Sequence, residues 1–539
     1  MILLALACAD GPATDSSSAP PEALHVPLSD ELLLRRMSLD LRGVPPDLED
    51  LDALEADPGQ LDGLRDSYLD DPLLEDRLVA MFADRWHTRI DEFQVVYGDY
   101  DLPQDLEFAF ARDVGEEPLR LMAWVAVTDQ PWPAIVTTDK TRATPLLGQV
   151  WPVDYPEGEQ GWQTVTWTDL RPPVGVLASN GLWWRYTTNA SNMNRARAAT
   201  LVRLLLCQDM LSRPVSLEGS VSLEDEDGTA QAIKNAPSCV ACHSSIEPLA
   251  SSLFGFWTTV EYNALESATY HPERESLGVA YLEAEPAYFG QPLSGLSDLG
   301  VAIANDPRFY RCAAESAAAM LWHREVEAED FASIEELRQD FIQGELAYRG
   351  LLRAVTDTAE YRAGALADHA TEEDLDREPT LRLLSPDQFA SSLLELTGFS
   401  WTSHGFDQLA NDKIGHRILL GGVDGYQVTR PQRDPGLTWT LVVERASQAA
   451  ADYAVESELV GGGAPRLFLN VDLAHQPGDA EFTAELEQLH RRLYATRADE
   501  AWQSAVQDLW LEVEADEGPA EAWKAVVSAL LRDPAFVGY

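Results

Sequence analysis

Two cysteines and a histidine stand close together in the segment Pro237-Ser-Cys-Val-Ala-Cys-His243, which constrains the local fold more than any other part of the sequence. Residues three apart lie on one turn of a helix, so Cys239 and Cys242 project to the same side. Two thiols with this spacing can each form a thioether bond to a haem, and the histidine that follows is placed under the iron as its proximal ligand. The motif therefore predicts one covalent haem c, held by Cys239, Cys242 and His243.

Two other chemistries use the same residue types. A zinc site needs four ligands, and no second Cys-x-x-Cys or spaced pair of histidines follows the motif. A thioredoxin-like dithiol belongs to a βαβ unit, and no such alternation of strands and helix surrounds the motif. Both stay open as alternatives, and the sequence favours haem over either.

The ligand on the iron face opposite His243 is not fixed by the sequence. Methionine and histidine are the usual ligands in electron-transfer cytochromes, and the candidates are Met193, His271, Met320 and His323. Each also has an ordinary interpretation, because methionines fill cores and histidines often lie on surfaces or near helix ends. An iron without a protein ligand on that face, and so with an open sixth coordination position, would instead favour peroxide or small-ligand chemistry.

The chain is strongly acidic, with 39 basic and 90 acidic residues and a formal net charge of −51. Such a charge repels phosphate backbones and anionic lipid, so we expect no nucleic-acid partner. It suits a heavily solvated surface, or docking to a basic partner. No run of about eighteen apolar residues occurs, so no membrane-spanning segment is expected.

The N-terminus carries features of an export signal. Residues 1–7 are apolar, and Ala5-Leu-Ala-Cys8 is similar to the processing box of bacterial lipoproteins. Residues 9–21 are rich in Ser, Ala, Pro and Asp, which is typical of a flexible tether. We expect a lipid on Cys8 and an exported protein, periplasmic or on the cell surface, attached to the membrane by that lipid alone. The alternative is a disordered tail in which the cysteine has no role.

The two remaining cysteines, Cys207 and Cys312, form an even remainder that can pair in an oxidising compartment. Their disulfide would close a loop of about 105 residues around the haem motif, a constraint worth about 4–5 kcal/mol in the chain-entropy model. We expect this disulfide. The alternative is a pair of buried, unbonded thiols, since the sequence does not give the distance between them.

Apolar residues recur mostly at helical spacing, so the expected fold is mainly α, with several domains and irregular or β insertions. A chain of 539 residues is too long for one core. We expect a lipoprotein signal and tether, an N-terminal helical domain, a cytochrome c-like haem domain and a C-terminal helical domain, bounded as 1–25, 26–175, 176–345 and 346–539. The clearest expected helices are Asn194–Cys207, Asp306–His323, Phe482–Tyr494 and Ala520–Leu531.

Three segments interrupt the helical pattern. Pro103–Pro173 is rich in Trp, Thr, Val and Pro, and we expect irregular structure with a few strands there. Ser212–Ala236 is acidic and contains glycines, which predicts a loop. Gly421-Gly-Val-Asp-Gly425 predicts a tight turn, and no lysine follows it as a phosphate-binding P-loop would require.

Several stretches carry a family resemblance. Leu32–Pro46 contains an Arg-Arg pair, a Leu-Asp-Leu and a Gly-Val-Pro-Pro ending, and Asp71–His87 contains an arginine followed by a tryptophan. Cys239–Pro248 continues from its histidine to Ile-Glu-Pro, and Leu493–Phe536 ends in Asp-Pro-Ala-Phe. These stretches resemble the planctomycete-type cytochrome c-associated multi-domain family. The resemblance includes a cysteine at both ends of the expected disulfide, and it implies export and haem binding without implying a reaction.

Three classes of function are compatible with these features. The first is an exported, lipid-anchored c-type cytochrome that exchanges electrons with another exported protein. The second is a haem enzyme of the peroxidase or oxidase type, and the third is a surface scaffold or binding protein with ancillary haem. A cytochrome c domain needs only about 100 residues, so the large flanking parts argue against a simple carrier. No catalytic residue is predicted, because no nucleophile–base arrangement is recoverable from the sequence.

Overall fold

The computed structural model describes residues 24–210, 212, 225–257, 264–379, 381–403, 405–410 and 415–539. About 60% of the described residues are helical, and the sheets within the described ranges are four antiparallel pairs of short strands. The prediction of a mainly α fold is therefore confirmed. No described helix is both long enough and apolar enough to cross a membrane. Cys8 and most of the acidic segment after Cys207 lie outside the described residues.

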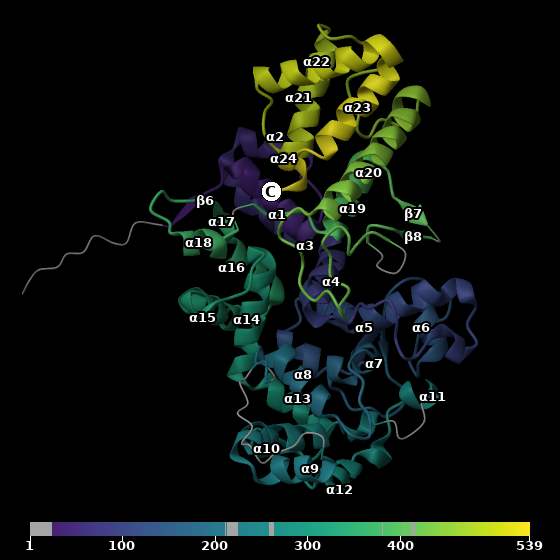
Figure 1. The fold of residues 1–539 in the computed structure, drawn as a ribbon, viewed down its shortest axis with the longest axis vertical. Helices are drawn as coiled ribbons and strands as arrows, with labels where there is room; N and C mark the ends of the chain where they lie inside the picture. The colour runs from purple at the N-terminus through teal and green to yellow at the C-terminus, as the bar shows by residue number, and fades with distance from the viewer. Residues whose placement is uncertain are drawn as a thin grey trace, which may run out of the picture.

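The elements follow one another in chain order (Figure 1). The first part contains β1 (His25–Pro27), α1 (Asp30–Arg42), α2 (Leu48–Ala56), α3 (Leu61–Asp70), α4 (Leu73–Trp86), α5 (Glu107–Val127), β2 (Lys140–Ala143), α6 (Pro145–Val150) and β3 (Gln163–Thr166). The middle part contains α7 (Asn180–Arg185), α8 (Arg195–Leu206), α9 (Glu226–Asn235), α10 (Pro237–Ser251), α11 (Ala264–Ser267), α12 (Leu277–Leu282), β4 (Ala287–Tyr288), β5 (Gln291–Pro292), α13 (Leu296–Ala304) and α14 (Pro307–Trp322).

The remaining elements are α15 (Phe331–Gln343), α16 (Tyr348–Thr356), α17 (Ala359–Arg362), β6 (Ala363–Leu366), α18 (Glu372–Arg377), α19 (Pro386–Thr397), β7 (Thr402–Ser403), β8 (Phe406–Asp407), α20 (Leu437–Ala454), α21 (Ala480–Tyr494), α22 (Glu500–Glu517), α23 (Pro519–Leu531) and α24 (Pro534–Val537). Short 3₁₀ helices cover Pro58–Gln60, Tyr97–Tyr100, Gln104–Leu106, Trp132–Val136, Gly175–Ala178, Phe254–Phe256, Pro272–Arg274 and Ala328–Asp330, and a π-helical turn, Val455–Val460, follows α20.

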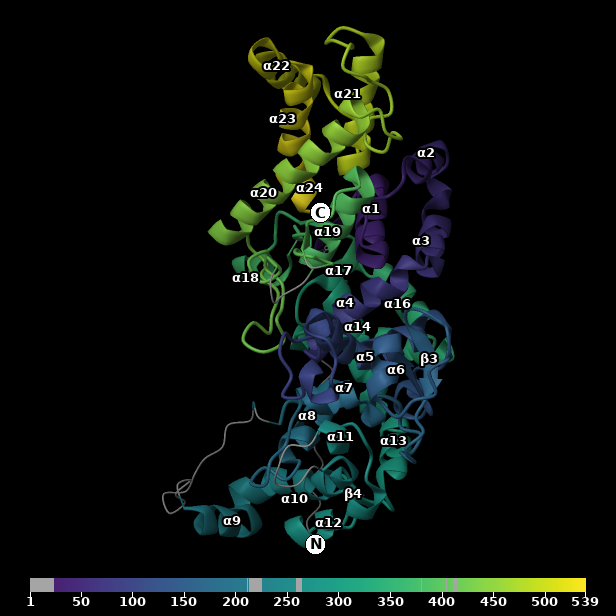
Figure 2. The ribbon, with the colours of Figure 1, turned by 90° about the vertical axis from the view of Figure 1, so that its right-hand side faces the viewer.

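The molecule is elongated. In Figures 1 and 2, α20 to α23 occupy one end, α9, α10 and α12 occupy the opposite end, and α4 and α14 lie between them. The C-terminus folds back to the middle and lies beside α1 (Figure 1).

Helix α1 shows how the ends of the chain are joined. Ser29 accepts a hydrogen bond from a first-turn amide, and Gly43 ends the helix with a left-handed φ of +78°. The two arginines of the Arg-Arg pair are buried. Arg35 donates to the carbonyls of Phe536 and Gly538 at 2.8 and 2.9 Å, and Arg36 donates to two carbonyls at 2.7 Å at the end of α17 and the start of β6. These charge-assisted bonds fix α1 to segments far along the chain.

Two large apolar cores and a smaller one lie within the described residues. The first contains buried residues between Leu33 and Tyr361 together with Ala495, and the second contains residues between Leu384 and Val537 together with one residue of α1. The third contains residues between Ile90 and Ala268. Residues of α5 and α8 share the first core, so the boundary predicted at 175/176 does not coincide with a break in packing. The predicted domain bounds stay a prediction.

Two local expectations are wrong in part. Pro103–Pro173 contains the expected strands β2 and β3, but it also contains α5, a long helix that includes Pro118, where irregular structure was expected. Ser212–Ala236 was expected to be a loop, and its described residues 226–235 form α9. Lys234 in the last turn of α9 complements the helix dipole and pairs with Glu283 at 2.9 Å, which stabilises this short helix.

Candidate functional site

The Cys-x-x-Cys-His motif lies in the first turns of α10. Pro237 is the first residue of this helix, where the missing proline N–H leaves no intrahelical hydrogen bond unmade. Cys239 and Cys242 are partly exposed and are free thiols, and Cys242 packs against the first core. The helix therefore presents two unbonded thiols and one imidazole on neighbouring turns.

A carboxylate one turn further along α10 holds the imidazole of His243. Nδ1 of His243 lies 2.7 Å from Oε1 of Glu247, and Nε of Arg195 donates to the same oxygen at 2.7 Å. The guanidinium of Arg195 also donates to the carbonyls of Ser191 and Asn192. Burial alone would raise the pKa of Glu247, but the hydrogen bonds of His243 and Arg195 hold that pKa below its ordinary value. The carboxylate is therefore ionised at neutral pH and fixes the orientation of the ring.

A second arginine of α8 fixes this helix against the chain that follows α10. Arg197 is buried and donates to the carbonyls of Tyr186, Phe256 and Trp183 at 2.8, 3.0 and 3.1 Å. Burial lowers the pKa of Arg197 to about 9, so it stays charged at neutral pH. Its bonds join the two sides of the site, because Phe256 follows α10 and the other two carbonyls precede α8.

The donor set at α10 fits a covalently attached haem. Both thiols are free, and the hydrogen bond that Nδ1 of His243 donates to Glu247 leaves Nε2 as the nitrogen able to bind iron. Four cavities among the described residues, including the largest of these four at about 580 Å³, are lined by other parts of the chain than the motif. Within those residues, no three His, Cys, Asp or Glu side chains form a group able to hold a bare metal ion. The fit therefore depends on the donor chemistry of the helix itself.

The structure separates the candidates for the opposite iron ligand. Met193 is half-buried against the first core and lies two residues before Arg195, which reaches the motif helix through its bond to Glu247. Met320 and His323 line a cavity elsewhere in the molecule, and no residue of α10 is among the residues that line it. Both ring nitrogens of His271 are already hydrogen-bonded. Met193 therefore stands next to a segment that contacts α10 through Arg195 and Glu247.

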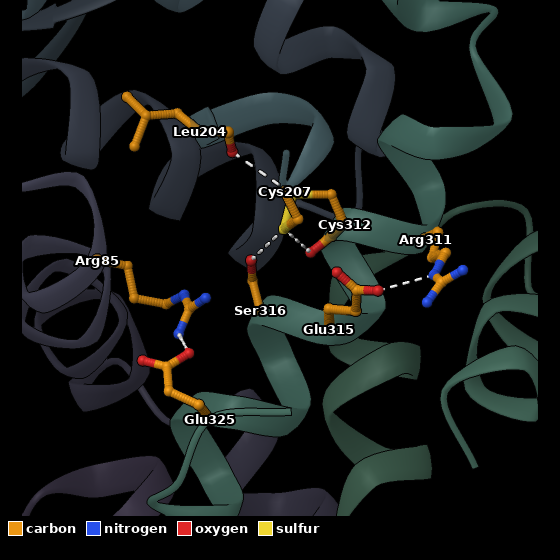
Figure 3. The surroundings of a disulfide bond; sticks show 8 residues. All are labelled: Arg85, Leu204, Cys207, Arg311, Cys312, Glu315, Ser316 and Glu325. Atoms are coloured by element: carbon orange, nitrogen blue, oxygen red, sulfur yellow. Dashed lines mark hydrogen bonds and ion pairs between the residues drawn. A yellow bond between two sulfur atoms is a disulfide. The ribbon is translucent and has the colours of Figure 1, made fainter. Parts of the chain in front are cut away.

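Cys207 and Cys312 are bonded to each other, with an S–S distance of 2.10 Å and a Cα–Cα distance of 5.1 Å (Figure 3). Cys207 ends α8 with a left-handed φ of 51°, and Cys312 lies buried in α14. The bond therefore fastens the helix that carries Arg195 to a central helix of the first core. It closes a loop of 105 residues that contains the Cys-x-x-Cys-His motif.

His323 belongs to a buried polar cluster that the sequence interpretation missed. Its Nε2 lies 3.0 Å from Oδ1 of Asp40 and 3.0 Å from the hydroxyl of Tyr539, and Arg382 lies 3.3 Å from the other oxygen of Asp40. Burial alone would raise the pKa of Asp40, but His323 and Arg382 hold it well below its usual range. His323 is the C-cap of α14, with a left-handed φ of 57°. This position agrees with the alternative expectation that His323 is a histidine near a helix end rather than an iron ligand. The available signal was Asp40 itself, an acidic residue between two leucines.

No protein-family model, curated protein or solved structure matches this chain.

Proposed function

We propose that this protein is an exported c-type cytochrome that binds one haem through Cys239, Cys242 and His243 and transfers electrons to or from another exported protein. The observation that carries the proposal is the arrangement on α10: two free thiols one turn apart, followed by an imidazole whose Nδ1 is fixed by Glu247. A bound haem c would supply one-electron redox chemistry.

The residues around the motif have defined tasks in this proposal. The two thiols provide the covalent attachment, and His243 offers Nε2 as the proximal ligand. Glu247 sets the rotation of the ring and makes it more electron-rich, because it is an ionised acceptor for the Nδ1 proton. Arg195 keeps that carboxylate charged and in place.

Export and lipid anchoring through Cys8 are the second part of the proposal. A disulfide between Cys207 and Cys312 supports it, because disulfides persist in oxidising compartments and are rare in the cytosol. In cells, we expect the wild type in the detergent-extracted membrane fraction and Cys8→Ser in the soluble fraction. Equal partitioning of the two proteins would refute the anchor.

The attachment of haem is tested in a host that matures c-type cytochromes. The denatured wild type should carry the mass of one haem, whereas Cys239→Ala and Cys242→Ala should each lose stable double attachment, because each thioether needs its own thiol. Ser244→Ala, a change at an exposed position of the same helix, is the matched control and should keep the added mass. A wild type without added haem mass would overturn the proposal.

The iron coordination of the loaded protein separates the two haem-based functions. A low-spin, six-coordinate spectrum supports electron transfer, and a high-spin, five-coordinate spectrum supports the haem-enzyme alternative. The position of Met193 beside Arg195 favours a methionine ligand, so Met193→Ala should convert a six-coordinate spectrum to a five-coordinate one. An unchanged spectrum would exclude Met193 as the ligand.

A further inference from the structure

A separate candidate binding site lies in the middle of the molecule, away from α10. A cavity of about 580 Å³ is bounded by α4, the end of α14, the start of α19 and the segment 417–439. Its volume is in the range of small-molecule sites. Eight arginines and five carboxylates line it, although the whole chain has more than twice as many acidic as basic residues. The cavity is therefore locally positive within a strongly negative protein.

The arginines of this cavity are not equally engaged. The guanidinium of Arg324 donates hydrogen bonds to the carboxylates of Asp330 and Glu378 at 2.6 to 3.0 Å, so its role is structural. Arg382 differs, because its side chain is 1% exposed and its Nε has no hydrogen-bond partner. Its contacts are long, at 3.3 Å to Asp40 and 3.4 Å to a backbone carbonyl. A buried guanidinium with an unused donor is costly unless a ligand completes its hydrogen bonds.

Two further arginines project from the loop that follows the glycine turn. Arg430 and Arg433 are exposed and line the cavity, and neither makes a hydrogen bond or ion pair with any other described residue. The loop that carries them is anchored, because the amide of Gln432 donates to the carbonyl of Gly421 at 2.9 Å. Gly421 has a φ of +88°, so the predicted tight turn is present and directs this loop over the cavity.

We propose that this cavity binds a small molecule carrying two or more oxyanion groups, phosphate or carboxylate. Arg382 would bind one group in the buried part of the cavity, and Arg430 and Arg433 would bind another at its entrance. The guanidinium group is suited to this task, because its paired N–H donors match the two oxygens of a carboxylate or phosphate. The proposal does not depend on haem binding.

The test is isothermal titration of the full-length protein at low salt with pyrophosphate and, separately, with citrate. The wild type should bind at least one of these probes saturably and with one-to-one stoichiometry. The double variant Arg430→Ala/Arg433→Ala should bind at least tenfold more weakly, and its fold should be unaffected because both side chains are exposed. Arg445→Ala removes an equally exposed arginine outside the cavity and should leave the affinity unchanged.

Each outcome bears on the proposal. Tighter binding of pyrophosphate indicates a phosphate-bearing ligand, and tighter binding of citrate indicates a polycarboxylate. Arg382→Gln, checked for folding by circular dichroism, should also weaken binding, since it removes the buried cation. Failure of both probes to bind saturably, or equal affinities for wild type and the Arg430→Ala/Arg433→Ala variant, would overturn the proposal.

Discussion

At the scale of single residues, the site on α10 was partly accessible from the sequence. Cys239, Cys242 and His243 were identified from their spacing, which is local. Glu247 follows His243 by four residues, and residues four apart lie on the same face of a helix, so their contact could be predicted from the sequence. Arg195 was not accessible, because only the packing of α8 against α10 brings it within 2.7 Å of that carboxylate. Local geometry is encoded in spacing, whereas partners from distant segments are determined by tertiary packing.

The bond between Glu247 and His243 yields a prediction about the haem-loaded protein. Glu247→Gln replaces an ionised acceptor with a neutral one, which makes the ring a weaker electron donor to the iron. We expect the midpoint reduction potential to rise by about 60 mV, equivalent to about 1.4 kcal/mol for one electron. A spectroelectrochemical titration measures it.

The matched control for this change is Glu273→Gln. Glu273 is an exposed carboxylate that lies 3.0 Å from Nδ1 of a different histidine, His271, so the charge change is the same. The midpoint reduction potential of the haem-loaded Glu273→Gln variant should stay at the wild-type value. Equal potentials for Glu247→Gln and the wild type would show that the carboxylate does not act on the iron ligand.

At the scale of elements, the strongly periodic helices were predictable and the irregular segments were not. The expected helix Asp306–His323 corresponds to α14, whose flanking residues Asp306 and His323 are its N-cap and C-cap. Helix α5 was missed because Pro118 and its neighbours weaken the local signal. Its stability comes from close packing, since a Cβ on Gly115 would lie 2.6 Å from the carbonyl oxygen of Thr88. Such contacts with segments elsewhere in the chain outweigh local preference.

The helix α21 contains a buried carboxylate whose ionisation should reduce stability. Oε2 of Glu485 accepts hydrogen bonds from the amides of Leu469 and Asn470 at 3.1 and 2.7 Å. Burial nevertheless raises the pKa of Glu485 from 4.5 to about 7, and these hydrogen bonds only partly oppose it. The stabilisation linked to the protonated form is complete below pH 4.5 and is lost as the pH rises through 7.

We therefore expect Glu485→Gln to alter the pH dependence of unfolding. Glutamine stays neutral, so the wild type should lose on the order of 3 kcal/mol relative to Glu485→Gln between pH 4.5 and pH 8. Urea unfolding at the two pH values measures the difference. Glu481→Gln, at an exposed position of the same helix, should follow the wild type. Parallel behaviour of Glu485→Gln and the wild type would contradict the prediction.

At the scale of the whole molecule, the ends of the chain are interdependent. The Arg-Arg pair of α1 was noted as part of a resemblance, and in the structure it binds carbonyls close to the C-terminus and at the end of α17. Asp40 of the same helix binds Tyr539, the last residue. The sequence indicated the positions of the clearest helices better than their grouping, because the cores are assembled from segments separated by hundreds of residues.

The disulfide between Cys207 and Cys312 acts at this scale, since it encloses the Cys-x-x-Cys-His motif in a loop of 105 residues. Closing such a loop restricts the unfolded chain by about 4–5 kcal/mol in the chain-entropy model, so reduction should lower the melting temperature by several degrees. Scanning calorimetry with and without reductant measures this shift. The double variant Cys207→Ser/Cys312→Ser should melt at the lower temperature and be insensitive to reductant. In the unreduced, denatured wild type, a thiol reagent should label neither cysteine, and full labelling of both would show that they are plain buried thiols.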